Sequence, residues 1–443
     1  MEILKDVLMK KIHYREAKIA VVGLGYVGLP LAIETANQGF KVYGIDICKD
    51  KIESLSLGKS YILDINDEDI KSHINKNLFV GCDFSIVSEV DAIIICVPTP
   101  LNEMKEPDVS YIKSVVKDIT KYLKAGVLIS LESTTYPGST EELVVKVIEK
   151  SRKIEVGKDF FVCHSPERVD PSNSTYHVKN TSKIIGGCTS NCLELGTALY
   201  EKIIEKVIPV SSIRVAEMAK LLENTFRSVN VALINELTMM SEFMDINIWE
   251  VIEAAGTKPF GFMPFYPGIG VGGHCLPVDP VYLSWKAKKY NYYNRFIELT
   301  TEINENMPRY VTNQIADILN NIEKSIKNSS ILMVGLTYKK DTNDLRESPA
   351  LKLFKLLKKK GAKIEYHDGY VPSLKYDQEI FYSQELTVAN IQRADITIIA
   401  TDHSYIDYQF IINNSKIVYD TKNATKGYKG RNIVLLGGYT MIE

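Results

Sequence analysis

Continuous hydrophobic runs alternate with amphipathic stretches along most of the chain. The run at 18–22 (KIAVV) is followed by glycines, then by a helical pattern, and then by a strand-like run at 41–46 (KVYGID). Later runs at 90–97, 127–132 and 160–164 are largely apolar throughout, which is typical of strands that are buried on both faces of a parallel sheet. Strands that alternate with helices predict an α/β fold built from Rossmann-like, doubly wound parallel sheets.

The same order of elements returns in the last third of the chain. Residues 330–336 (SILMVGL) match the first strand and its turn, 358–368 match the second strand, and 394–403 match the third. Such an internal repeat predicts a second Rossmann-like unit.

The turn of the second unit differs from that of the first. After Gly335 it reads TYKKDTNDLRESPA, without the later glycines, so it cannot hold a pyrophosphate in the same way. One interpretation is an exposed turn whose charges cancel. The other is a site for a phosphate or a sugar carboxylate, because the turn carries the cations Lys339, Lys340 and Arg346.

A single long helix is predicted at 211–245, with two serines at its start as N-cap candidates. At 1.5 Å per residue it is about 50 Å long. Its polar stripe is either solvated or faces a cleft between domains, and it contains Glu217, Lys220 and Asn224 at positions i, i+3 and i+7. The predicted domains are an N-terminal extension (1–17) with a short amphipathic helix, a nucleotide-binding domain (18–210), a central helical domain (211–310) and a C-terminal nucleotide-fold domain (311–443).

Composition removes several classes of function. The chain has 443 residues, 45% hydrophobic and 24% charged, and a formal net charge of −2, so nothing draws it to nucleic acid or to an anionic membrane. Its apolar runs are too short to span a bilayer, and its start lacks a signal peptide. Seven scattered cysteines resemble neither a disulfide framework nor a metal cluster. We expect a soluble cytoplasmic protein with no metal.

The first strand, turn, helix and second strand match a dinucleotide-binding unit. Gly23 permits the tight turn, Gly25 lets the backbone approach a pyrophosphate, and Gly28 lets the helix pack on the strand. Asp46 ends the second strand and favours NAD over NADP, because a carboxylate accepts from the ribose hydroxyls and repels a 2′-phosphate. Lys51 lies just beyond and either contacts the adenosine ribose or is a solvated surface lysine.

Polar residues follow the next three buried strands. Ligands of open parallel sheets lie outside the carboxyl ends of the strands, which places Thr99 and Thr134 at the cofactor. Glu167 follows the strand at 160–164 and is either functional or simply solvated or ion-paired.

A glycine-rich segment at 265–285 (FYPGIGVGGHCLPVDPVYLSW) sets Cys275 four residues before Asp279. Because glycines carry no Cβ, such a loop can approach a ligand closely and place the cysteine at its surface. The alternative is a small hydrophobe buried in a tight turn.

With GLGYVGLP, PTP, SPERVDP, AEMAKLLENT, GVGGHCLPVDP and GLTYKKDTNDLRESP in this order, the sequence resembles the UDP-glucose/GDP-mannose dehydrogenase family over nearly its whole length. It looks most like the branch that oxidises UDP-N-acetylglucosamine. UDP-N-acetylmannosamine and UDP-glucose are the alternative substrates, and Val278, where UDP-glucose enzymes usually have a lysine, argues against UDP-glucose. Rival interpretations are a one-step 3-hydroxyacid dehydrogenase and a non-catalytic nucleotide-sugar-binding protein.

The resemblance implies a homodimer formed through the long helix, a role in polysaccharide biosynthesis, and oxidation of a sugar CH2OH to COOH with two NAD. It implies Cys275 as nucleophile, Lys220 and Asn224 as oxyanion stabilisers, and Asp279 and Glu167 for protons and water. Thr134 would position water and cofactor. By the same match the cofactor would be held by Gly23, Gly25, Tyr26, Val27, Gly28, Asp46, Lys51, Thr99, Thr134 and Arg346. The UDP-sugar would be held by Glu167, Lys220, Asn224, Phe265, Tyr266, Gly268, Gly272 and Lys339, with Lys258 reaching across the dimer.

Overall fold

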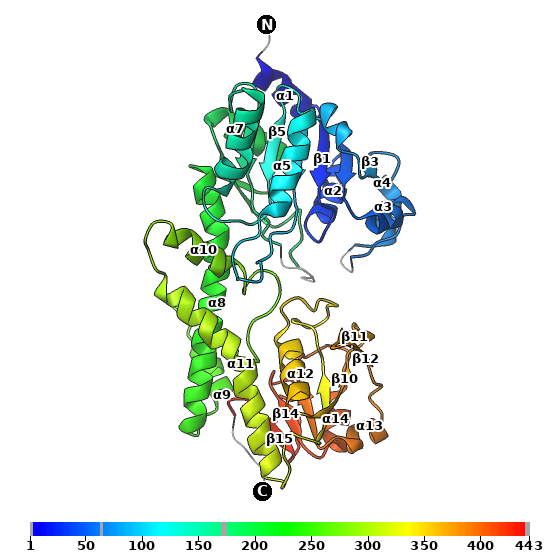
Figure 1. Cartoon of the computed structure of the whole chain (residues 1–443), viewed down its shortest axis with the longest axis vertical. Coiled ribbons are helices and arrows are strands. Elements are labelled where there is room, and N and C mark those ends of the chain that lie inside the picture. The colour runs from blue at the N-terminus through cyan, green and yellow to red at the C-terminus, as the bar shows by residue number, and fades with distance from the viewer. Residues whose placement is uncertain (1–2, 63–64, 170–174, 439–443) are drawn as a thin grey trace. The chain divides into compact units, whose positions relative to one another are not determined.

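The computed structural model describes residues 3–62, 65–169 and 175–438. The chain divides into two compact units, the first formed by 1–223 with 281–292 and the second by 224–280 with 293–443. Each unit is built around its own parallel sheet (Figure 1). The predicted α/β fold class is therefore confirmed, while the four domain boundaries remain predictions.

The sheet of the first unit has eight strands in the order β3-β2-β1-β4-β5-β6-β7-β8. All neighbours are parallel except β6 and β7. Because β1, β2, β4, β5 and β6 are parallel, their carboxyl ends lie at one edge of the sheet, where ligands of such sheets bind. The strands are β1 (Lys18–Val22), β2 (Lys41–Ile45), β3 (Leu78–Gly81), β4 (Ala92–Ile95), β5 (Leu128–Leu131), β6 (Phe161–His164), β7 (Lys183–Gly187) and β8 (Val207–Val210).

Helices cover this sheet with the periodicity expected of amphipathic segments. α5 buries Ile112, Val115, Val116 and Ile119, a spacing of three and four residues. One face of the sheet packs against α2, α7 and the N-terminal helix α1, whose Leu8 and Ile12 join the core. The structure thus has the helix that was predicted in the N-terminal extension, packed on this face of the sheet. The helices are α1 (Leu4–His13), α2 (Gly28–Asn37), α3 (Lys49–Ser56), α4 (Asp67–His73), α5 (Ser110–Tyr122), α6 (Lys146–Arg152) and α7 (Ser190–Tyr200).

The second unit repeats the topology of the first. Its five parallel strands have the order β10-β9-β13-β14-β15, equivalent to β2-β1-β4-β5-β6, and the turn after the first strand is fixed by the same hydrogen bond in both units. The Leu24 N–H donates to Asp46 at 2.9 Å, and the Leu336 N–H donates to Asp368 at 2.8 Å. The predicted internal repeat is therefore confirmed. The strands are β9 (Ser330–Val334), β10 (Lys363–His367), β13 (Ile396–Ile399), β14 (Val418–Asp420) and β15 (Ile433–Leu435).

Helices α11 and α12 pack side by side on this second sheet (Figure 1). A separate hairpin joins two short antiparallel strands. The remaining elements of the unit are α9 (Ile248–Gly256), α11 (Arg295–Asn320), α12 (Pro349–Lys359), α13 (Val388–Arg393), α14 (Tyr408–Asn414), β11 (Ser373–Tyr376) and β12 (Glu379–Tyr382).

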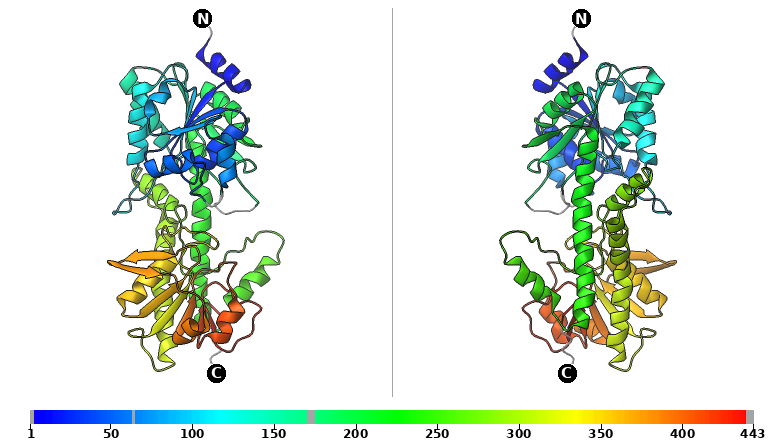
Figure 2. Two further views of the ribbon diagram at one scale, coloured as in Figure 1. Left: turned by 90° about the vertical axis from the view of Figure 1, so that its right-hand side faces the viewer. Right: turned by 90° about the vertical axis from the view of Figure 1, so that its left-hand side faces the viewer.

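The predicted long helix is α8 (Ile213–Phe243), one uninterrupted helix of 31 residues (Figure 2). Ser212 caps it, since its Oγ accepts from the Val215 N–H at 3.3 Å. Helix α10 (Asp279–Lys288) follows the cysteine segment. None of the described helices is long and apolar enough to cross a membrane.

Candidate active site

The three glycines of the β1–α2 turn have three different surroundings. Gly23 has φ +92°, and a Cβ there would lie 2.8 Å from the Cys96 carbonyl oxygen. A Cβ on Gly28 would lie 1.9 Å from the Gly23 carbonyl oxygen, whereas a Cβ on Gly25 would meet nothing within 4 Å. α2 begins at Gly28 without a side-chain cap. The Leu29 N–H donates to the Gly25 carbonyl at 3.1 Å, so it is the helix dipole, with the open space at Gly25, that favours an anion here. The turn therefore fits the pyrophosphate of NAD.

Asp46 lies where the ribose-binding acid of such a unit belongs. Its carboxylate accepts from the Leu24 N–H and the Cys48 N–H, both at 2.9 Å, and pairs with the Lys51 ammonium at 3.2 Å. Lys51 is thus anchored at the end of β2 rather than free in solvent, and its ammonium lies 5.8 Å from the centre of the Tyr61 ring.

Two alanine substitutions in this turn have opposite expected effects. Gly25→Ala leaves the folded structure intact, with the free energy of unfolding changed by less than about 0.5 kcal/mol. It obstructs the pyrophosphate and weakens NAD binding by about tenfold or more. Gly28→Ala forces the backbone apart and destabilises the first unit by about 1–3 kcal/mol. Thermal unfolding and NAD titration of both variants check this; equal loss of stability in both would contradict it.

Residues after β4, β5 and β6 meet at the same edge of the first sheet. The Thr99 carbonyl accepts from the Tyr282 hydroxyl at 3.0 Å, and the Ser133 hydroxyl donates to the Val97 carbonyl at 2.7 Å. Thr134 is partly exposed beside buried neighbours. Thr99, Thr134 and Glu167 thus follow three neighbouring parallel strands, and their contacts with a ligand remain predictions.

Glu167 is an ion-paired residue. Its Oε1 accepts from the N–H groups of Arg168 and Val169, both at 2.7 Å, and its Oε2 lies 3.0 Å from the Lys183 ammonium. Burial alone would raise the pKa of Glu167, but Lys183 and the Val169 N–H outweigh it and hold the pKa below its ordinary value. The carboxylate is therefore ionised at neutral pH. Sequence reasoning missed Lys183.

The polar stripe of α8 is buried, so the solvated alternative is wrong. Glu217 anchors the turn before α6: its carboxylate accepts from the Thr140 N–H at 2.9 Å and the Ser139 hydroxyl at 2.8 Å. Lys220 is only 6% exposed, yet it pairs with no carboxylate among the described residues of its unit. A buried ammonium without an anion is suited to stabilising one that forms during a reaction.

Asn224 and Asp279 are brought together in the second unit. The Asn224 amide donates to the Asp279 carboxylate, and the Arg227 guanidinium donates to the Asn224 oxygen. Both Asn224 and Asp279 are buried. The Cys275 carbonyl accepts from the Asp279 N–H at 2.9 Å, so these two residues are one helical turn apart. Cys275 itself is partly exposed, which does not fit the alternative of a buried hydrophobe.

The glycines of the cysteine segment were expected to let the loop approach a ligand, but three of them lie against other parts of the protein. A Cβ on Gly270 would lie 2.6 Å from the Asn304 carbonyl oxygen, one on Gly272 would lie 2.6 Å from the Tyr338 Cβ, and one on Gly273 would lie 2.8 Å from the Tyr338 ring. These three glycines thus approach protein rather than an open ligand site. The segment is also held by the Gly273 N–H, which donates to the Arg346 carbonyl at 2.9 Å.

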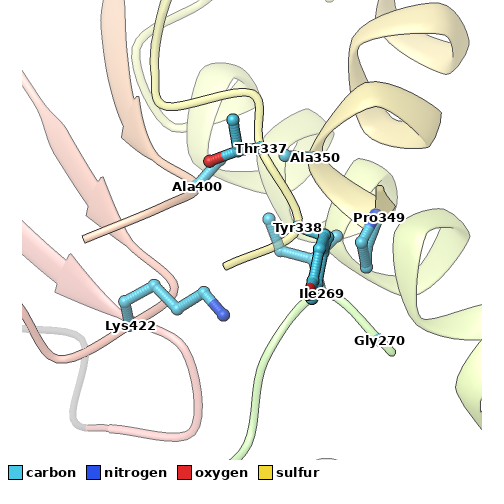
Figure 3. A pocket seen from close by; sticks show the side chains of 8 residues that line it. All are labelled: Ile269, Gly270, Thr337, Tyr338, Pro349, Ala350, Ala400 and Lys422. Atoms are coloured by element: carbon cyan, nitrogen blue, oxygen red, sulfur yellow. The ribbon is translucent and has the colours of Figure 1, made fainter. Parts of the chain in front are cut away.

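A small hollow opens beside the cysteine segment in the second unit (Figure 3). Lys422 extends into it from the loop after β14, opposite the Tyr338 ring and Pro349 (Figure 3). Neither Lys339 nor Arg346 lines this hollow. Arg346 binds both carboxylate oxygens of Asp344 at 2.6 and 3.0 Å. The cation that lines the hollow is Lys422, which sequence reasoning missed although it lies two residues after the end of β14.

Several residues predicted to contact the sugar nucleotide lie in the segment before Cys275. The Tyr266 ring stacks on Trp249 at 5.8 Å, the Phe265 ring meets Phe226 edge-on at 5.9 Å, and the Gly268 N–H donates to the buried Asn235 at 3.1 Å. The Lys258 ammonium lies 4.9 Å from the Phe260 ring centre. No group of His, Cys, Asp and Glu among the described residues is arranged to hold a metal.

A dinucleotide turn in one Rossmann-like unit, a second such unit without the turn, and a cysteine beside buried polar groups define a nucleotide-dependent oxidoreductase. Profiles of one family match three segments: its NAD-binding domain at 17–204, its central domain at 214–306 and its UDP-binding domain at 332–427. The chain belongs to the UDP-glucose/GDP-mannose dehydrogenase family, which confirms the resemblance, the NAD cofactor and an oxidoreductase activity.

Individual relatives carry two different substrate names. The UDP-N-acetyl-D-glucosamine 6-dehydrogenase of Pseudomonas aeruginosa is 37% identical over 81% of this chain and 84% of its own. The UDP-N-acetyl-D-mannosamine dehydrogenase of Pyrococcus horikoshii is 34% identical over 92% of this chain and 96% of its own. A solved structure of the P. horikoshii UDP-D-ManNAc dehydrogenase superimposes with a TM-score of 0.87, at 32% identity, over 96% of this chain and 100% of that one.

Proposed function

We propose that the protein oxidises the C6 hydroxymethyl group of a UDP-N-acetylhexosamine, with UDP-N-acetyl-D-glucosamine as the preferred substrate, to the uronic acid. One observation carries this proposal: a partly exposed cysteine lies one helical turn before a buried aspartate that is itself bound by a buried asparagine. A dehydrogenase that stops at the aldehyde needs no thiol, whereas a thiol can hold the aldehyde covalently during its further oxidation to the acid.

The thiol chemistry follows from this arrangement. When bound, NAD accepts hydride, and converting CH2OH to a carboxylate requires two such transfers and one water. The Cys275 thiolate attacks the C6 aldehyde, and the carbonyl electrons move to oxygen, giving a thiohemiacetal. Loss of the second hydride from C6 leaves a thioester. Water then attacks the thioester carbonyl, the C–S bond breaks, and the thiolate is regenerated as the acid leaves.

The other residues have roles that suit their surroundings. Lys220 and Asn224 stabilise the negative charge on the sugar oxygen, and Lys220 also favours the Cys275 thiolate. Asp279 is a proton carrier, and the ionised Glu167 orients the hydrolytic water together with Thr134. The UDP moiety is held in the second unit by Phe265, Tyr266, Gly268 and Lys339, together with Lys422, which lines the hollow.

A substrate panel tests the proposed specificity. UDP-N-acetylglucosamine is expected to give the highest kcat/KM when compared with UDP-N-acetylmannosamine, UDP-N-acetylgalactosamine and UDP-glucose, followed by NADH absorbance. The relatives named for two different N-acetylhexosamines support an N-acetylhexosamine over UDP-glucose, as does the buried Val278 in place of a cation. The highest kcat/KM with UDP-glucose would contradict the proposal, and no NADH with any sugar would favour a non-catalytic binding protein.

We also propose that the protein is a homodimer through α8. Within 224–243 the buried face is mostly polar: Asn224, Ser228, Asn235, Thr238 and Ser241 are buried together with Ala232 and Ile234. The opposite side exposes apolar residues at a seven-residue spacing: Phe226 at 47%, Leu233 at 48% and Met240 at 49%. Such a repeat is suited to packing against a second helix. A second copy of the chain carries the same apolar stripe, and the family match also favours self-association. We therefore infer that the partner is another protomer.

Charge on this stripe is expected to separate the protomers. Leu233→Glu places a carboxylate where an apolar partner surface would lie, so light scattering should show monomers where the unmodified protein forms dimers. Ile380→Glu, at an exposed apolar position in β12, is the matched control and should remain dimeric. A Leu233→Glu protein that stays dimeric would exclude this surface as the interface.

A further inference from the structure

A buried group of charges lies behind the ligand-binding edge of the first sheet. The Lys183 ammonium is 2.7 Å from the Glu132 Oε2 and 3.0 Å from the Glu167 Oε2. Lys183 is 4% exposed and Glu132 is 1% exposed. Burying ionised groups is costly unless they satisfy one another, and a purely structural site of this size can be filled by apolar residues. Neither Glu132 nor Lys183 has a role in the reaction as described above.

Glu132 is itself held from a second side. The Tyr200 hydroxyl donates to the Glu132 Oε1 at 2.5 Å and lies 2.8 Å from the Ser130 hydroxyl. Tyr200 comes from α7, while Glu132 directly follows β5 and Lys183 begins β7. The ammonium is therefore fixed by elements on both sides of β6, the strand whose carboxyl end leads to Glu167.

This arrangement leaves Glu167 little freedom. Two N–H groups occupy its Oε1 at 2.7 Å each, and the ammonium occupies one position on its Oε2. A carboxylate oxygen can accept more than one hydrogen bond, so Oε2 retains a position for a water. The donors are the Arg168 and Val169 N–H groups and the Lys183 ammonium, which come from two separate segments. Together they fix the direction of the lone pair that remains on Oε2.

We propose that Lys183 is a positioning residue: anchored by Glu132, it keeps the Glu167 carboxylate ionised and aimed at the water that hydrolyses the Cys275 thioester. This inference rests on the proposed function, in which Glu167 orients that water. It adds a dependence of the second half of the reaction on a lysine that does not contact the substrate.

The surrounding titratable groups leave Lys183 as the cation that controls Glu167. Burial, and then the Lys183 charge, lower the pKa of His164 to about 3, so that its imidazole is neutral. Burial raises the pKa of the Cys96 thiol and of the Tyr200 hydroxyl, so both are neutral as well. The Arg168 guanidinium is directed to Glu223 at 2.7 Å and to the Ser182 carbonyl at 2.6 Å. Removing Lys183 should therefore raise the pKa of Glu167.

The test uses Lys183→Met in a Glu132→Gln background, because that double variant removes the Glu132 carboxylate together with its cation and leaves Glu167 as the carboxylate whose ion pair with Lys183 is lost. The acidic limb of its kcat–pH profile is expected to move up by about one to three pH units. Mass spectrometry of the intact protein during turnover at pH 6 should show the sugar-thioester adduct accumulating, while KM for the UDP-sugar and NAD binding change less than about threefold. Lys183→Arg should restore the profile, and Glu132→Gln alone should not move the limb up.

Several results would overturn the inference. A double variant that folds with an unshifted acidic limb and no adduct would make Lys183 purely structural, and so would a Glu167→Gln variant that hydrolyses the thioester at the normal rate. Failure of the proposed function is distinguishable, since in that case the unmodified protein itself produces no NADH from any UDP-sugar.

Discussion

Cys275→Ser is expected to abolish formation of the uronic acid while NAD binding is unchanged. A serine hydroxyl at neutral pH is not ionised and cannot replace the thiolate that captures the aldehyde. Loss of a nucleophile of this kind lowers kcat by roughly 10³-fold to 10⁶-fold. Cys275 is partly exposed and lies in a loop outside the strands of both sheets, so the isosteric change should not affect folding.

The matched control for this prediction is Cys82→Ser. Cys82 is an exposed cysteine at the end of β3, and its replacement should leave activity and stability at the level of the unmodified protein. NADH production and the uronic acid are measured for both variants, with NAD binding followed by titration. Full acid production by Cys275→Ser would reject the nucleophile assignment.

Lys220→Met is the second large expected effect. Lys220 is buried without an anionic partner among the described residues of its unit, so its charge serves a ligand or a transition state rather than the fold. Removing one group that stabilises a developing oxyanion costs roughly 10²-fold to 10³-fold in kcat. The loss should appear in kcat, with protein stability unchanged or increased because a buried charge is removed.

Lys286→Met is the control that separates a specific effect of Lys220 from the general effect of removing a buried lysine. Lys286 is also 6% exposed, but its ammonium pairs with Glu142 at 2.7 Å. Breaking that pair should lower stability without changing kcat by more than about threefold. If the two variants lost activity equally, Lys220 would have no special role in the reaction.

Elements with local sequence signals were predictable. The dinucleotide unit was found because glycine spacing, strand patterning and Asp46 lie within 30 residues of one another, and the second unit was found because it repeats that pattern. The long helix was found from its period. In each case the physical cause, whether backbone freedom or burial of one face, acts over neighbouring residues.

Contacts set by the order of the strands were not predictable. Lys183 and Glu132 are 51 residues apart and meet only because β5 and β7 flank β6. A lysine that begins a strand looks like a solvated end. The glycines of the cysteine segment were misinterpreted for a related reason. Gly270, Gly272 and Gly273 lack a Cβ where Asn304 or Tyr338 packs against them, and that proximity depends on packing within the second unit.

The central claim is that one enzyme-bound sugar passes through two oxidations before release, and the number of NADH formed per sugar tests it most directly. A limiting amount of UDP-N-acetylglucosamine is incubated with excess NAD and the protein, and the NADH and the sugar product are quantified. Two NADH per sugar consumed, with uronic acid and no free aldehyde, is the predicted result. One NADH per sugar with free aldehyde in solution would contradict the claim.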